Sequence, residues 1–303
     1  MKDMNKTNIK RSQAAPVVAI MYDFDKTLCT KDMQEYTFIP SIKMEPGEFW
    51  AEATKKATEE KMDRILAYMY LMLKNARAKE VSIRREAFKE GGMNIEYFDG
   101  VKEWFSRIRD FGAEHGVSVK HYIISSGLRE IIEGSEIFDE FDEVYACEFL
   151  YDVDGIAVWP KQVVNYTTKT QFLFRINKGI SDISDDDSLN EYVNEDERPV
   201  PFRNMIYIGD GLTDVPCMKL VKINGGYSIA VYTDKRKVSD LMTDDRVNYI
   251  TKADYSEGTE LDEIVKDIIT KMAATDRLVR KHLEQMGELA EDDLGECDPE
   301  DEQ

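Results

Sequence analysis

The chain has 303 residues, of which 42% are hydrophobic, so it is long enough for a core domain of about two hundred residues and a smaller second lobe. Its formal net charge is −20, and residues 288–303 contribute nine acidic and no basic side chains. This balance argues against nucleic-acid or anionic-membrane binding, which depends on clustered Lys and Arg. The four cysteines form no Cys-x-x-Cys pair, so neither a zinc site nor a disulfide framework is indicated.

Residues 1–15 are expected to be a flexible polar segment. Their basic residues are not followed by the apolar stretch of a secretory signal, and no run in the chain approaches membrane-spanning length. We therefore expect a cytoplasmic protein without a membrane partner, acting on a small diffusible molecule.

The first predicted element is a buried strand that ends in a pair of carboxylates. The run from Val17 is apolar and rich in β-branched residues, which is typical of a strand covered on both faces of a parallel sheet. Asp23, Asp25 and Thr27 follow it. Since ligands of such sheets bind at the carboxyl ends of the strands, this position predicts a site for a metal ion and a phosphate. The Asp-x-Asp-x-Thr pattern alone is a weak signal in so acidic a chain.

Residues 31–97 predict an inserted helical domain. From residue 45 to residue 90 the sequence is charged and nearly free of Gly and Pro, with helical apolar stripes. One stripe consists of Ile65, Met69, Met72 and Leu73. Residues 67–73 are open to a second interpretation as a hydrophobic binding box, but their helical spacing favours the core of the insert. A further amphipathic helix from Val101 is expected to pack on the sheet.

A second strand leads to a candidate anion site. Ser125 is expected at the strand end, with Ser126 and Gly127 in the turn before a helix, an arrangement that can hold an anion. The alternative is that Ser125 is only a helix cap. The next strand and a turn at Asp154-Gly155 predict a hairpin.

The third candidate is a lysine in the first turn of an amphipathic helix. The helix dipole disfavours a cation at that end, so Lys169 is expected to have a local role, with Lys178 as the competing candidate. The acidic segment 182–201 is expected to be a solvated excursion. A strand at 205–208 then leads to Asp210 and, four residues on, Asp214. These two acids fit one pocket, the alternative being a Gly-rich turn with a capping Asp.

The remaining sequence predicts two strands at 227–232 and 247–250 and a helix over about 261–272. Residues 276–303 are expected to form a C-terminal helix and an acidic tail, and the tail is expected to be disordered.

In this order, six residues resemble the four motifs of the haloacid dehalogenase superfamily, in the arrangement of its phosphoserine-phosphatase-like branch. They are Asp23, Asp25, Ser125, Lys169, Asp210 and Asp214. The resemblance covers about residues 16–30 and 98–252. It implies an α/β fold with a Rossmann-like parallel sheet core, over 16–30 and 98–275, and an inserted helical cap over 31–97. Lys26 stands where the family commonly has Gly, so that loop is expected to differ in backbone freedom and to bring an extra cation to the entrance of the site.

The resemblance implies a Mg²⁺-dependent phosphatase that hydrolyses a small phosphorylated metabolite through an aspartyl-phosphate. Asp23 is then the nucleophile, and Asp25, whose pKa is raised by neighbouring carboxylates, is the general acid and later the base. The implied Mg²⁺ ligands are Asp23, Asp210 and the backbone carbonyl of Asp25. Asp214 is expected to orient Lys169 or a metal-bound water. The implied phosphate-binding residues are Thr27, Ser125, Ser126, Gly127 and Lys169.

Three other functions share part of this pattern of residues. A phosphomutase or phosphotransferase of the same superfamily would use the same residues with a different cap. The complete set of acids argues against a non-catalytic, metabolite-binding relative. A receiver domain is shorter, carries its phospho-acceptor on a later strand and has no insert after its first strand. The sequence does not identify the leaving group of the substrate.

The cap is expected to close over Asp23, with hinges near Thr30 and Asp99.

Overall fold

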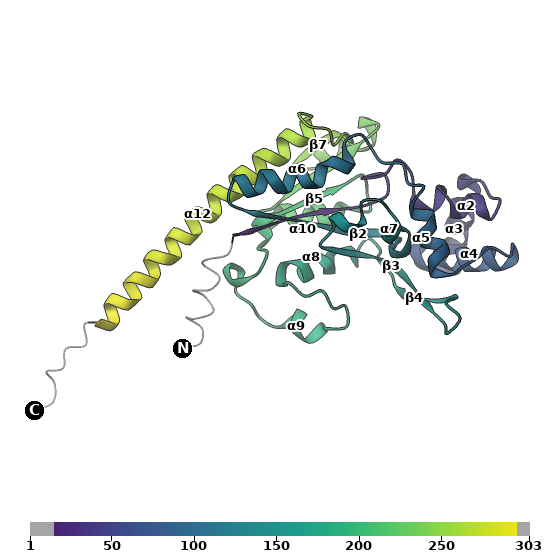
Figure 1. Ribbon diagram of the computed structural model, residues 1–303, viewed down its shortest axis with the longest axis horizontal. Helices are drawn as coiled ribbons and strands as arrows, with labels where there is room; N and C mark the ends of the chain where they lie inside the picture. Colours follow the sequence, from purple (N-terminus) through teal and green to yellow (C-terminus); the bar gives the residue numbers. More distant parts are fainter. Residues whose placement is uncertain (1–14, 296–303) are drawn as a thin grey trace, which may run out of the picture.

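A seven-stranded sheet forms the centre of the molecule, as the computed structural model, which describes residues 15–295, shows (Figure 1). The strands lie in the order β4-β3-β2-β1-β5-β6-β7, and all neighbours are parallel except β3 and β4. Their bounds are β1 Val17–Tyr22, β2 Ser118–Leu128, β3 Glu143–Tyr151, β4 Ala157–Gln162, β5 Met205–Gly209, β6 Tyr227–Tyr232 and β7 Tyr249–Lys252. The predicted α/β fold with a parallel core sheet is confirmed.

The position of β1 explains where a ligand would bind. β1 lies between β2 and β5 and is almost completely buried, as its unbroken apolar sequence predicts. The chain runs from β1 to β2 on one side and later returns to β5 on the other side. The carboxyl ends of β1 and β5 therefore meet at the point where the strand order reverses, which is where open α/β sheets bind ligands.

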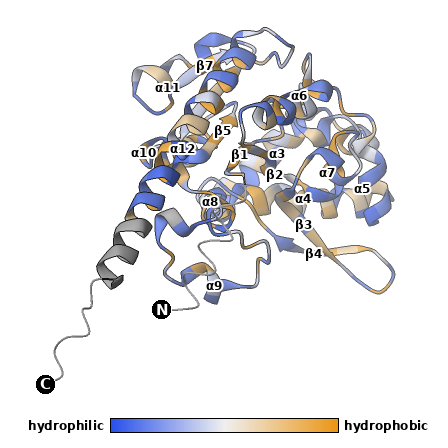
Figure 2. Ribbon diagram, turned by 60° about the vertical axis from the view of Figure 1, so that its left-hand side comes forward, coloured by the Kyte–Doolittle hydropathy of each residue, from blue (hydrophilic) through white to orange (hydrophobic). Residues whose placement is uncertain are grey.

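Helices cover both faces of this sheet (Figure 1). α6 (Val101–Glu114) and α12 (Glu260–Gly295) lie on one face, whereas α8 (Lys169–Lys178) and α10 (Val215–Ile223) lie on the other. Shorter helices connect these elements: α7 (Arg129–Glu133), α9 (Asp186–Asn190) and α11 (Ser239–Thr243). The central strands are mainly hydrophobic, whereas the outer helices carry many hydrophilic residues (Figure 2). No helix of the described part of the chain is both long and apolar enough to cross a membrane.

The first four α-helices after β1 lie beyond its carboxyl end (Figure 1). They are α2 (Phe38–Ser41), α3 (Pro46–Glu60), α4 (Arg64–Ala78) and α5 (Arg85–Gly92). We call residues 33–92 the helical insert. α4 begins where the Asp63 carboxylate accepts hydrogen bonds from two backbone amides of its first turn. Met69, Met72 and Leu73 are buried, so the predicted stripe does form the core of the insert.

Two expectations about elements were wrong. β2 does not end at Ser125 but continues to Leu128, because its register with β3 shifts between Ile124 and Leu128 and the strand thus passes through the turn. The helix expected over about 261–272 and the C-terminal helix expected from residue 276 form one continuous helix that ends at Gly295, so the expected disordered tail is helical as far as that residue. Residues 296–303, like residues 1–14, lie outside the described part of the chain.

The sequence predicted the β3–β4 hairpin correctly, and the segment after α8 contains a short helix. β3 and β4 form the predicted antiparallel hairpin, and Gly155 in its turn has a φ of 72°, which favours glycine. The acidic segment 182–201 contains α9. Its first residues are fixed by the buried Arg175 of α8, which donates hydrogen bonds to the carbonyls of Asp182 and Ile183.

Candidate active site

Three carboxylates converge at the carboxyl ends of β1 and β5. Asp23 follows β1, Asp210 follows β5, and Asp214 directly precedes α10. One carboxylate oxygen from each lies within 4.8 Å of the others. Asp23 and Asp214 are buried. The structure thus joins Asp214, expected only to orient its neighbours, to the two acids that the sequence proposed as metal ligands.

Lys169 lies against this cluster. It is the first residue of α8 and is fully buried, with its Nζ 2.7 Å from Asp214 Oδ1 and 3.1 Å from Asp23 Oδ1. Burial alone would lower the pKa of this lysine, but the charges of Asp214 and Asp23 raise its pKa above the ordinary value. Lys178, at the other end of α8, instead donates hydrogen bonds to the carbonyls of Leu189 and Glu191. The structure therefore brings Lys169, and not Lys178, to the acids.

Asp25 has different partners from those of the three clustered acids. Its Oδ1 accepts a 2.7 Å hydrogen bond from the backbone amide of Met33, the first residue of the helical insert. Burial, followed by the charges of Asp32 and Asp23, raises the pKa of Asp25 well above its usual value. A raised pKa favours the protonated form of the carboxyl group, which is the form that a general acid needs.

Gly127, one of the proposed phosphate-binding residues, lies beside Asp25. Ser125 Oγ accepts a 3.0 Å hydrogen bond from the amide of Gly127, so Ser125 orders the turn and does not cap a helix. A Cβ on Gly127 would lie 2.1 Å from Met33 Cε and 3.0 Å from Asp25 Oδ2, so a larger residue here would require the flexible Met33 side chain to move. Among the described residues, the buried Thr27 Oγ1 and Ser126 Oγ have no hydrogen-bond partner. Unpaired buried hydroxyl groups are costly, and a bound anion would satisfy them.

The charges of the site fit a divalent cation. Burial, followed by the charges of neighbouring carboxylates, raises the pKa of Asp210 to about 8, whereas burial raises the pKa of Asp23 to about 6 against the opposing charge of Lys169. Lys169 alone does not neutralise the three clustered carboxylates. Carboxylate oxygens are the ligands that Mg²⁺ prefers, so the donor set of Asp23, Asp210 and Asp214 fits this ion.

The helical insert contacts the edge of this site. The hydroxyl group of Tyr68 on α4 donates a 2.7 Å hydrogen bond to the carbonyl of Ser126. Asn165, which precedes α8, donates to Asp63 at the start of α4 with a distance of 2.8 Å. Lys26 adopts a φ of 57°, the left-handed region where glycine is favoured, and forms an ion pair with Asp32.

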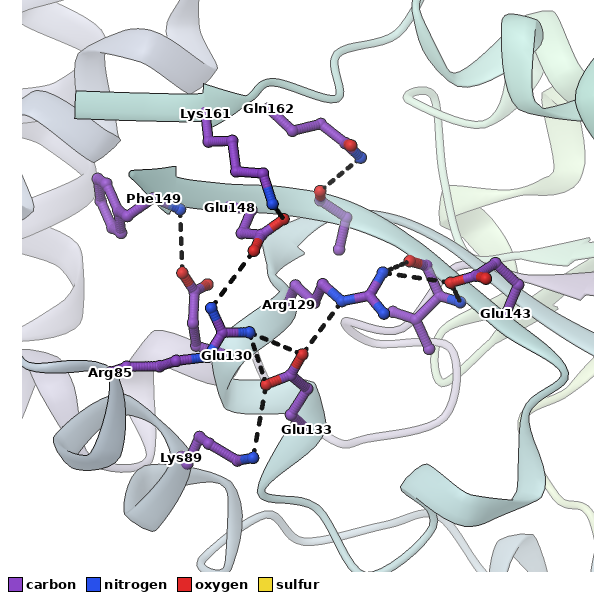
Figure 3. Close-up of polar contacts among 12 residues, drawn as sticks. Arg85, Lys89, Arg129, Glu130, Glu133, Glu143, Glu148, Phe149, Lys161 and Gln162 are labelled. Atoms are coloured by element: carbon purple, nitrogen blue, oxygen red, sulfur yellow. Dashed lines mark hydrogen bonds and ion pairs between the residues drawn. The ribbon is translucent and has the colours of Figure 1, made fainter. Parts of the chain in front are cut away.

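A network of ion pairs joins the insert to the sheet domain on the side of α5 (Figure 3). Arg85 of α5 binds both carboxylate oxygens of Glu133 on α7 at 2.9 Å and lies 3.4 Å from Glu148 on β3. Lys89, one turn further along α5, lies 3.6 Å from Glu133. Gly92 permits this close approach, because a Cβ there would lie 2.1 Å from the carbonyl oxygen of Ile131.

Sequence reasoning missed two groups that hold site residues in place. The Tyr207 hydroxyl donates a 2.8 Å hydrogen bond to Asp214 Oδ1, and the Tyr68 hydroxyl binds the Ser126 carbonyl. Tyr207 gave one signal, which is a hydroxyl-bearing side chain inside the otherwise aliphatic run of β5. Tyr68 gave none, because an aromatic residue in an apolar helical stripe is typical of a core.

Comparisons with known proteins agree with this geometry. The family model of the haloacid dehalogenase-like hydrolases matches residues 20–219. An uncharacterized protein of Borreliella burgdorferi is 28% identical over 273 residues, which cover 81% of this chain and 94% of that protein.

Solved structures show the same fold. A HAD family hydrolase from Salmonella enterica has a TM-score of 0.54 at 15% identity, over 79% of this chain and 69% of that one. A substrate-bound phosphoserine phosphatase has a TM-score of 0.53 at 16% identity, over 82% of this chain and 97% of that one. A probable phosphoserine phosphatase from Vibrio cholerae has a TM-score of 0.53 at 15% identity, over 89% of this chain and 69% of that one.

Proposed function

We propose that this chain, which belongs to the haloacid dehalogenase-like hydrolase family, is a Mg²⁺-dependent phosphatase that hydrolyses a small phosphorylated metabolite. The observation that carries the proposal is the cluster of Asp23, Asp210 and Asp214 around the single buried ammonium of Lys169. The three clustered carboxylates outnumber this one buried cation, so together they repel a phosphate dianion. Such a site therefore needs a bound cation before it can accept that substrate.

The metal ligands belong to this proposal. Mg²⁺ would be held by Asp23 and Asp210, with Asp214 or the backbone carbonyl of Asp25 as a further ligand. When bound, the ion supplies the positive charge that lets the phosphate dianion approach the nucleophile. Lys169 offsets the remaining charge on the phosphoryl oxygens, and the hydroxyl groups of Thr27, Ser125 and Ser126 donate hydrogen bonds to them.

The reaction has two steps carried by two carboxylates. In the first, an oxygen of Asp23 forms a bond to phosphorus, the bond from phosphorus to the leaving oxygen breaks, and Asp25 gives its proton to that oxygen. In the second, a water molecule attacks phosphorus, Asp25 takes a proton from the water, and the bond to Asp23 breaks. Inorganic phosphate leaves and both carboxylates return to their first state.

The helical insert would act as the cap of this site, with residues 31–97 as the cap and residues 16–30 and 98–275 as the core domain. Tyr68 and Met33 support this role, because both belong to the insert. Tyr68 binds the carbonyl of Ser126, and the amide of Met33 binds Asp25. A cap in this position excludes water and limits the size of the leaving group. A cytoplasmic location fits a phosphatase of diffusible metabolites and belongs to the same proposal.

The test is a hydrolysis screen over a panel of phosphorylated metabolites, with Mg²⁺ or with excess chelator. We expect phosphate release from a small subset of the panel in Mg²⁺, none in chelator, and none from the Asp23→Asn variant, which lacks the nucleophile and one metal ligand. Full activity in chelator would overturn the metal requirement. Unchanged activity of the Asp23→Asn variant would overturn the assignment of the site.

A further inference from the structure

Tyr207 is a buried tyrosine of β5 whose hydroxyl group contacts one of the active-site acids. It lies at the middle of β5, pairs with Met21 of β1 and is fully shielded from solvent. Its hydroxyl donates a 2.8 Å hydrogen bond to Asp214 Oδ1. Burial, followed by the charge of Asp214, raises the pKa of the phenol well above its usual value, so the group remains a donor.

The same oxygen of Asp214 receives a second donor. Lys169 Nζ lies 2.7 Å from Asp214 Oδ1 and 3.1 Å from Asp23 Oδ1, so the ammonium is shared between two carboxylates. The other oxygen, Asp214 Oδ2, has no hydrogen-bond partner among the described residues. Tyr207 is thus the second donor that fixes the orientation of this carboxylate beside Lys169.

Without the hydroxyl, Lys169 would be the single described donor left to Asp214 Oδ1. The buried carboxylate would then compete more strongly for the ammonium, which would move away from Asp23. The Asp214 side chain would also be free to rotate, so the three clustered oxygens would no longer be held within 4.8 Å of one another. Partners that orient ligands from behind are commonly worth ten- to a hundredfold in metal affinity or activity.

We propose that Tyr207 is a positioning residue of this site, which holds the Asp214 carboxylate, and through it Lys169, in place for reaction at Asp23. The inference rests on the proposed phosphatase function. It assigns no contact between Tyr207 and substrate.

The chain offers a closely matched control for the test. Tyr22 is also fully buried and lies on β1, the strand next to β5. Its hydroxyl, however, binds Trp104 and His121 on the side away from the acids. Tyr22→Phe and Tyr207→Phe therefore remove the same atom from neighbouring central strands, and only Tyr207→Phe removes it from the site.

Two measurements on the full chain decide the role of Tyr207. We expect Tyr207→Phe to weaken Mg²⁺ binding to the metal-free protein by about tenfold in calorimetry and to lower kcat by about tenfold. Tyr22→Phe should leave both values unchanged while lowering the melting temperature. In the Asp214→Asn background, Tyr207→Phe should have no further effect on either value, because it acts through Asp214.

Wild-type Mg²⁺ affinity and kcat in Tyr207→Phe would overturn the inference, as would equal losses in Tyr22→Phe or full additivity with Asp214→Asn. If the wild-type chain hydrolysed no phosphate ester, the proposed function would fail. The Mg²⁺ titrations would still decide whether Tyr207 positions Asp214.

Discussion

Asp25 and Asp23 are separated by one residue, yet their surroundings give them opposite tasks. Asp23 contacts the ammonium of Lys169, which favours its charged form. Asp25 accepts a hydrogen bond from the Met33 amide but faces the negative charges of Asp32 and Asp23, and its pKa is raised well above the usual value. The pair therefore supplies a nucleophile and a proton donor.

Asp25→Asn tests this division in two measurements, of turnover and of Mg²⁺ binding. With an alkyl phosphate, kcat should fall by at least ~10²-fold, because the leaving alkoxide no longer receives a proton. Mg²⁺ binding, measured by calorimetry, should remain, since the side chain of Asp25 is not proposed as a ligand. A collapse of Mg²⁺ affinity would instead make the Asp25 side chain a metal ligand.

The two lysines at the ends of α8 allow a matched comparison. Lys169→Ala should weaken the binding of a metal-fluoride phosphate mimic by about ten- to a hundredfold, because a buried charge-assisted hydrogen bond is worth about 1.5–3 kcal/mol. Lys178→Ala should leave that affinity unchanged, since Lys178 binds carbonyls of the 182–201 segment. The reverse result in a binding titration would remove Lys169 from the site.

At this scale the sequence indicates the chemistry better than the supporting contacts. Asp23, Asp210 and Lys169 could be chosen because each follows a strand or begins a helix where such a residue is unusual. The hydroxyl group of Tyr207 was too weak a signal to select this residue, because a tyrosine in a buried strand usually fills space. The place of Asp214 among the clustered acids depends on how the turn after β5 folds, which no local pattern specifies.

Among the elements, α5 is joined more tightly to the core domain than a simple cap would be. Arg85 and Lys89 bind Glu133 of α7 (Figure 3). A Cβ on Gly92 would lie 2.1 Å from the carbonyl oxygen of Ile131 on α7, so α5 also lies close to the backbone of α7. The predicted hinges near Thr30 and Asp99 place α5 in the moving body. A movement of the whole insert about these hinges would therefore have to break the ion pairs of Arg85 and Lys89 with Glu133.

Gly92→Ala tests the strength of this joint. The added Cβ would meet the Ile131 carbonyl at 2.1 Å, so the variant should lose about 1–3 kcal/mol of unfolding free energy in urea titrations. Gly47→Ala is the control, because nothing lies within 4 Å of a Cβ at that helical position in α3. It should be neutral or stabilising by up to about 1 kcal/mol. Equal stability of the two variants would contradict the close packing of α5 on α7.

The order of elements was predictable where periodicity was strong and less so where tertiary contacts decide. The strands β1, β5 and β6 and the helices of the insert follow directly from their apolar patterns. The continuation of β2 through Ser125 depends on its pairing with β3, and sequence periodicity carries no information about such a register shift. The length of α12 was underestimated because its last turns are polar.

For the whole molecule, a buried histidine makes stability depend on pH. His121 lies in the core between β1 and α6, and burial, followed by the charge of Arg109, lowers its pKa to about 3. The unfolded chain takes up a proton near pH 6.5 whereas the folded chain does not. This group therefore contributes stability above pH 6.5 that is lost as the pH falls toward 3.

The expected loss from this one group between pH 7 and pH 5 is about 2 kcal/mol of unfolding free energy. Urea titrations at the two pH values should show it in the wild-type chain and in the His115→Gln control, which changes a partly exposed histidine on the end of α6. The His121→Gln variant should be less stable at pH 7 but lose about 2 kcal/mol less on acidification. An identical pH dependence in all three proteins would contradict a neutral His121.

The central claim is that Asp23 carries the phosphoryl group in a covalent intermediate. An aryl leaving group needs no proton, so Asp25→Asn should still form this intermediate from a radiolabelled aryl phosphate but should lack the base that breaks it down. Acid quenching in Mg²⁺ should then recover close to one label per chain, labile to hydroxylamine and confined to the peptide that contains Asp23. The additional change Asp23→Asn should abolish the label. Steady hydrolysis by the wild-type chain with no label in either background, or a label on another peptide, would contradict the account.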